Sequence, residues 1–96
     1  MLRVTAQDEA EVIRLKIEGR LAGADVNNVE SYWQTITADR EYSPILIDLT
    51  GVTFVDEAGK RLLAEMNRHG DKFVASGLMT KAIIEEVSRE RMRDEG

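Results

Sequence analysis

The chain has 96 residues, which suits one domain with a modest hydrophobic core and is too short for two. Its formal net charge of -5 at pH 7 argues against nucleic acid and anionic membranes as main partners, because both favour surplus Lys and Arg. The absence of cysteine excludes disulfides and thiol chemistry and fits a reducing, cytoplasmic location. No apolar run is long enough to predict a membrane-spanning segment, and the N-terminus lacks the apolar core of a signal peptide.

Two runs of alternating apolar and polar residues open the chain, separated by a polar turn over residues 7–11. Their apolar positions are Leu2, Val4, Ala6, Ile13, Leu15 and Ile17. A period of two residues is typical of strands with one buried face, so the two runs are predicted to pair as a hairpin. Gly19 and Gly23 then bracket a short irregular piece around Leu21, where a third, short strand is predicted.

A helix is predicted next, capped by Asp25 and ending near Asp39. Apolar residues recur in it at helical spacing, at Val26, Val29, Trp33 and Ile36. Trp33 lies on this stripe and is therefore predicted to be a core residue. After Pro44, the nearly continuous apolar run Ile45–Leu49 predicts a strand that is covered on both faces.

The second helix is predicted to begin at Asp56 or one residue later and to stop at Gly70, a residue suited to a left-handed cap. His69, just before that cap, is predicted to complement the negative end of this helix. A strand over Lys72–Ala75 follows. A last helix, with apolar positions at Met79, Ile83 and Val87, is predicted to run into a charged tail that starts at about residue 89.

The order of elements is strand, strand, short strand, helix, strand, helix, strand, helix (β-β-β-α-β-α-β-α). Strands separated by helices pair in parallel through right-handed crossovers, whereas the opening hairpin is antiparallel. We therefore predict an α/β fold, with a mixed sheet of four to five strands and three to four helices, in a single domain over residues 1–96.

An acidic turn follows the buried strand and opens the second helix. Free backbone N–H groups and the helix dipole at such a turn favour a carboxylate or a phosphate. Asp56 and Glu57 already place two carboxylates there. This turn is the strongest candidate for a functional site in the chain.

The segment over residues 48–56, Asp-Leu-Thr-Gly-Val-Thr-Phe-Val-Asp, with Gly59 and the Leu62-Leu63 pair, resembles the STAS domain. This module is shared by anti-sigma factor antagonists and the cytoplasmic tails of sulphate transporters. The resemblance extends over roughly residues 2 to 90, judged by the order of elements as well as by the motif. It implies a regulator that works by binding a protein partner, without an active site or a cofactor of its own.

In the signalling members of that family, the turn equivalent to Asp56–Gly59 normally reads Asp-Ser-Ser-Gly or Asp-Ser-Thr-Gly. The hydroxyl residue after the aspartate accepts phosphate from a partner kinase that is also an anti-sigma factor. Here Glu57 and Ala58 fill those positions, and neither has a hydroxyl group. A phosphoserine adds about -1.5 to -2 charges, and a glutamate supplies -1. Two interpretations stay open: Glu57 imitates the phosphorylated state, or it is an ordinary acid that complements the helix dipole.

Three further residues are weaker candidates for the site. Asp48 is either functional or, as a structural residue, points outward at the strand end or is satisfied by backbone N–H groups. Thr50 and Thr53, expected in a loop, either accept phosphate in place of the missing serine or form turn hydrogen bonds.

A different class of function is a receiver-like phospho-acceptor domain that binds Mg²⁺. Asp48, Asp56 and Glu57 would then gather at one end of the sheet, with Lys72 or Lys81 as the cationic partner. Receivers are longer and fully parallel, and this chain has no adjacent acid pair after its first strand. These differences argue against a metal site.

The sequence has no Gly-rich phosphate loop, no nucleophile beside a histidine base and no HExxH-like pattern, so a non-enzyme is predicted. Two kinds of protein partner are compatible with a binding module of this type. One is an anti-sigma factor of the serine kinase type, in bacterial partner switching. The other is the cytoplasmic ATPase of an ABC transporter, on which the chain would dock as an accessory subunit.

Overall fold

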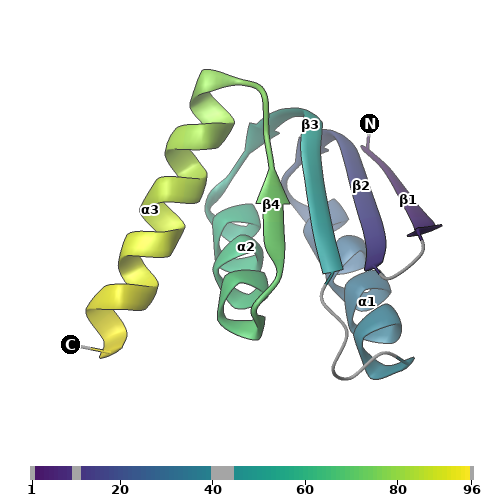
Figure 1. The fold of residues 1–96 in the computed structure, drawn as a ribbon. Coiled ribbons are helices and arrows are strands. Elements are labelled where there is room, and N and C mark those ends of the chain that lie inside the picture. The colour runs from purple at the N-terminus through teal and green to yellow at the C-terminus, as the bar shows by residue number, and fades with distance from the viewer. Residues whose placement is uncertain (1, 10–11, 40–44, 96) are drawn as a thin grey trace.

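The computed structural model describes residues 2–9, 12–39 and 45–95 of the chain (Figure 1). The elements in these residues are β1 (Leu2–Glu9), β2 (Val12–Leu21), α1 (Ala24–Asp39), β3 (Ile45–Val55), α2 (Glu57–His69), β4 (Lys72–Val74) and α3 (Leu78–Glu95). The predicted α/β class is confirmed, with four strands and three helices in the described residues. The side chains of the charged tail predicted from residue 89 lie outside the described ones.

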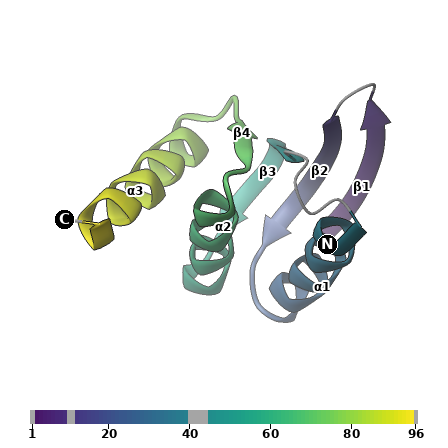
Figure 2. The same ribbon diagram turned by 60° about the horizontal axis from the view of Figure 1, so that its bottom comes forward.

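The four strands form one mixed sheet in the order β1-β2-β3-β4. β1 and β2 pair antiparallel as the predicted hairpin, whereas β2 with β3 and β3 with β4 are parallel. Helices α1 and α2 lie on the same face of the sheet, and α3 lies beside α2 beyond the β4 edge (Figures 1 and 2). The opposite face of the sheet carries no helix from the described part of the chain.

The core lies between the sheet and the helices. Its largest fully buried side chains are Leu15, Ile17, Leu21, Val29, Ile45, Ile47, Leu49, Leu63 and Met66. Burial of each Leu, Ile or Met contributes about 1.5–3 kcal/mol relative to an exposed side chain. Trp33 is only 5% exposed, which confirms its prediction as a core residue. None of the described helices is long and apolar enough to cross a membrane.

The prediction of a separate short strand around Leu21 is wrong, because β2 continues without a break to that residue. Its pairing with β3 shifts register twice, between Lys16 and Glu18 and between Gly19 and Arg20, and still ends with Leu21 beside Val55. Gly19 has a φ of +102°, so it accommodates the irregularity within the strand.

β3 is longer than the predicted strand Ile45–Leu49, because parallel pairing with the end of β2 extends it to Val55. Thr50 and Thr53 are therefore exposed strand residues, and their prediction as loop residues is wrong. The prediction that this strand is covered on both faces is also wrong, because helices lie on only one side of the sheet.

The first helix begins two residues earlier than expected. α1 starts at Ala24, so Asp25 lies in its first turn and does not precede the helix as a cap. Gly23 stands directly before α1 with a φ of +62°. Its carbonyl accepts a hydrogen bond from the Val26 N–H at 3.2 Å, and this contact closes the turn that opens the helix.

Candidate functional site

Asp56 caps α2 and also joins that helix to the turn before α1. Its Oδ1 atom accepts a hydrogen bond from the Gly59 N–H at 2.8 Å, the usual role of an N-cap aspartate. Its Oδ2 atom accepts the Gly23 N–H at 2.9 Å. The Asp56 N–H in turn donates to the Leu21 carbonyl at 3.2 Å. The predicted start of the helix is confirmed, and Asp56 is a fixed part of the scaffold.

The hydrogen bonds from Gly23 and then from Gly59 lower the pKa of Asp56 below its ordinary value, although desolvation acts in the opposite direction. A carboxylate in this position also complements the positive end of the α2 dipole. The turn therefore carries a permanent negative charge at neutral pH.

Gly59 sets how closely the first turn of α2 approaches the sheet. A Cβ atom at this position would lie 2.5 Å from the Leu21 carbonyl oxygen and 2.8 Å from Val55 Cγ1. Neither distance is compatible with a side chain unless the backbone moves. Gly59 is needed for close packing of helix against strand, and this packing holds the turn in place.

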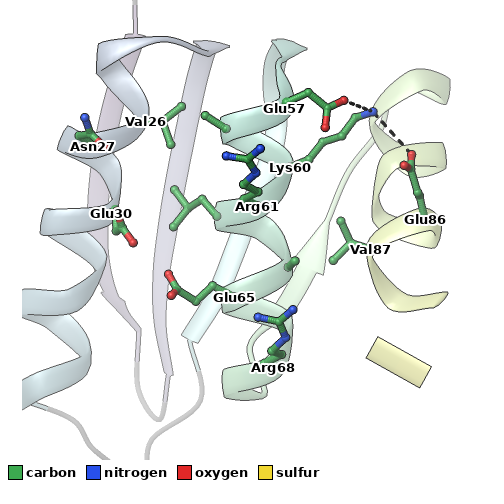
Figure 3. Close-up of a pocket in the computed structure, with 13 residues that line it drawn as sticks. Val26, Asn27, Glu30, Glu57, Lys60, Arg61, Glu65, Arg68, Glu86 and Val87 are labelled. Carbon is green, nitrogen blue, oxygen red and sulfur yellow. Dashed lines mark ion pairs between the residues drawn. The ribbon is translucent and has the colours of Figure 1, made fainter. Parts of the chain in front are cut away.

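Glu57 is the first residue of α2, and its side chain is 81% exposed. Its carboxylate lies 3.6 Å from Lys60 Nζ, which also lies 3.7 Å from Glu86 of α3 (Figure 3). The next residue, Ala58, is half-buried and packs against the core. Among the four predicted turn residues, Glu57 is thus the one whose charge is exposed to solvent.

A groove of about 640 Å³ extends from Glu57 along α2, with walls from α1 and α3 (Figure 3). Its apolar surface comes from Val26, Ala58, Leu62, Ala64 and Val87. Within it, Glu30 of α1 points toward Glu65 of α2. Burial and then a hydrogen bond to Glu30, in which the protonated Glu65 carboxyl donates, raise the pKa of Glu65. The predicted turn therefore borders a groove with an apolar surface and charged walls.

Asp48 is buried on the face of the sheet opposite the core, with 5% exposure. Its Oδ1 atom accepts from the Thr50 N–H at 2.9 Å and the Thr50 hydroxyl at 2.7 Å, and its Oδ2 atom lies 2.7 Å from Arg14 Nη1. Burial acts to raise the pKa of Asp48, but the bonds from Thr50 and Arg14 outweigh it and lower that pKa. Asp48 points away from the core as predicted, but it lies within β3 and not at a strand end, and it is buried. The predicted bond from a backbone N–H is present.

Asp48 and Thr50 form a local cluster of their own within β3, and Thr53 is an exposed position of the same strand. Within residues 2–9, 12–39 and 45–95, no group of three or more His, Cys, Asp or Glu side chains is arranged to hold a metal ion. The acidic cluster of Asp48, Asp56 and Glu57 required by the receiver-like alternative is therefore not formed.

Asp71 is a buried polar residue that the sequence did not single out. Its Oδ2 atom accepts the Trp33 Nε1–H at 2.7 Å, and its Oδ1 atom lies 2.9 Å from His69 Nδ1. The rings of Trp33 and His69 meet edge to face, with centroids 5.6 Å apart. His69 thus lies in the last turn of α2, as predicted, but it also pairs with Asp71. The one available signal was an aspartate placed directly after the Gly70 cap.

The family model of the STAS domain matches residues 3–72 of the chain. The chain belongs to the STAS domain family. As a STAS domain it has the fold of an anti-sigma factor antagonist from Mycobacterium paratuberculosis, at 20% identity and a TM-score of 0.80 over 96% of this chain and 82% of that one. Comparison with curated protein sequences gave no match.

A second similar structure is the anti-sigma factor antagonist SpoIIAA in its unphosphorylated form. It shares 17% identity with this STAS domain, with a TM-score of 0.64 over 95% of this chain and 98% of that one. A structure of Mglu is also similar, at 17% identity and a TM-score of 0.59, over 76% of this chain and 19% of the other. At these sequence identities, the similarity shows a shared fold.

Proposed function

We propose that this STAS domain is a non-catalytic protein interaction module that acts in bacterial regulatory partner switching in the cytoplasm, in the manner of an anti-sigma factor antagonist. One observation carries the proposal. Glu57, 81% exposed, stands at the first position of α2, where signalling members of the family have the hydroxyl that accepts phosphate. The partner is a protein of the anti-sigma factor and serine kinase type.

The rigid surroundings of Glu57 support a role in binding. Asp56 and Gly59 hold the turn through backbone contacts to Gly23 and Leu21, so the position of the Glu57 backbone is set by the scaffold. A preorganised surface loses less conformational entropy when a partner binds. The neighbouring groove offers apolar area for a partner side chain beside the charge.

Glu57 supplies a permanent negative charge at the position where signalling members of the family carry a regulated phosphate. Its carboxylate supplies one negative charge, where a phosphoserine adds about -1.5 to -2. Lys60, at 3.6 Å, offsets part of this charge, but the pair is exposed and therefore weak. A partner that selects the unphosphorylated surface binds this domain poorly, and a partner that prefers the acidic surface binds it well.

The test is titration calorimetry of the wild type and the Glu57→Ser and Glu57→Gln variants with the cognate kinase. Loss of the negative charge is expected to strengthen binding by about tenfold, the effect of removing a repulsive charge at an interface. Glu85→Gln is the matched control, because it removes an exposed acid of α3 that does not line the groove. Unchanged affinity after Glu57→Ser would refute the assignment of Glu57 as the switch position.

A second candidate is an accessory subunit that docks on the ATPase of a transporter. The observation that favours it is the absence of a hydroxyl at both Glu57 and Ala58, because a constitutive docking surface needs no phosphorylation. Co-expression and size-exclusion chromatography of the chain with each of the two partner types distinguishes them. A stable complex with the ATPase, and none with the kinase, would favour the second candidate.

A further inference from the structure

The helix-free face of the sheet is basic although the protein is acidic. Alternation along the strands directs side chains to this face wherever their neighbours enter the core. By this rule it carries the cations Arg3, Arg14, Lys16, Arg20 and Lys72. They are five of the 13 Lys and Arg residues of the chain. Among the side chains that the structure describes, the face carries two acids, Glu18 and Asp48. The charge of this face is therefore opposite to that of the whole protein. We name it the basic sheet face.

Two of these cations are held in place by contacts on the sheet. The Arg14 guanidinium lies 2.7 Å from the buried Asp48 carboxylate and is only 31% exposed. The Arg20 guanidinium lies 4.7 Å from the centroid of the Phe54 ring, within range of a cation–π contact. Contacts already restrict these two side chains. They therefore lose less conformational entropy when they bind an anion than free Arg side chains would.

The remaining three cations provide the charge that is available to a partner. Arg3 on β1 and Lys72 on β4 are exposed at opposite edges of the sheet, and Lys16 on β2 is half-buried between them. Together they place positive charge on β1, β2 and β4, from one edge of the sheet to the other. An extended or helical segment that crosses the strands would meet several of these cations in turn.

We propose that the basic sheet face binds an Asp- and Glu-rich segment of a partner protein. Charge complementarity identifies the segment, since opposite charge steers encounter and selects the partner. Nucleic acid fits less well, because its affinity comes from neutralising many backbone phosphates, whereas this face offers few cations and Arg14 is already paired with Asp48. The face lies across the sheet from the groove beside Glu57, so both surfaces are available at once.

The test uses fluorescence anisotropy with a labelled oligoglutamate peptide as the probe. The double variant Arg3→Glu with Lys72→Glu reverses two exposed charges on the face and is expected to weaken binding by at least about tenfold. The matched control, Arg61→Glu with Lys81→Glu, makes the same change in net charge on α2 and α3. It is expected to alter affinity by no more than about twofold, because charges beyond a Debye length are screened at physiological salt.

Two further measurements guard against misfolding and against a different ligand. Circular dichroism verifies that each variant is folded, and NMR titration of the wild type is expected to shift amide signals of β2 and β3 more than those of α1 and α2. Equal loss in both double variants, no binding by the wild type, or tighter binding to oligothymidylate or phosphatidylserine vesicles would overturn the proposal. Glu57→Ser is expected to leave peptide binding unchanged, so this test is independent of the proposed function.

Discussion

Asp56 and Gly23, which are 33 positions apart in sequence, are joined by a hydrogen bond of 2.9 Å from the Gly23 N–H to the Asp56 carboxylate. The same carboxylate caps α2 through Gly59. The residue that starts the second helix therefore also fixes the turn before the first helix. The backbone that presents Glu57 is held from both sides by this one side chain.

Replacement of Asp56 by alanine is expected to destabilise the fold, because it removes the cap of α2 and leaves the Gly23 N–H without its acceptor. Asp56→Asn retains an oxygen acceptor and is expected to cost less. Urea denaturation followed by circular dichroism gives both free energies of unfolding. Equal stability of the alanine variant and the wild type would show that the cap contributes nothing.

Replacement of Gly59 by alanine is expected to lower the free energy of unfolding by about 1–3 kcal/mol, because the new Cβ would overlap the backbone oxygen of Leu21. Gly77→Ala is the matched control, since its nearest neighbour would be Thr80 Oγ1 at an ordinary 3.7 Å. The same denaturation assay measures both variants. A larger loss for Gly77→Ala than for Gly59→Ala would contradict the close packing of α2 on β2.

Asp71→Ala is expected to cost about 1–3 kcal/mol, because it leaves the buried Trp33 Nε1–H without a partner. The expected loss is smaller in a Trp33→Phe background, where that donor is absent. Trp33 is the one tryptophan of the chain, so its fluorescence reports on the site directly. Additive losses in the two backgrounds would argue against the hydrogen bond as the source of the effect.

Asp48 is expected to contribute stability that depends on pH. Its folded-state pKa is lowered, so the contribution is fully present above the ordinary value of 3.8 and is lost as the pH falls from there through the folded pKa. The difference in free energy of unfolding between the wild type and Asp48→Asn should therefore be largest near neutral pH and shrink in acid. A difference that stays constant from neutral pH down to pH values below 3.8 would contradict this assignment.

The parts of the fold that local patterns encode could be predicted from the sequence. Alternation in the first 17 residues indicated the hairpin, and Asp56 and Gly70 marked both ends of α2. The exposed Glu57 at the start of that helix was also placed correctly.

The features that depend on distant residues were missed. β3 continues past Gly51 because residues 18–21 of β2 pair with it in parallel, and the register shifts between these strands leave no periodic signal. The bond between Trp33 and Asp71 joins residues 38 positions apart. The basic sheet face likewise appears only when β1, β2 and β4 lie in one sheet.

The central claim is that the Glu57 carboxylate stands where a regulated phosphate acts in related proteins. The direct measurement is the Kd of the Glu57→Ser variant for the cognate kinase, before and after that kinase has phosphorylated the introduced serine. We expect the unphosphorylated variant to bind more tightly than the wild type, and the phosphorylated variant to return to wild-type affinity or weaker. Identical affinities for the wild type and the unphosphorylated variant would contradict the claim.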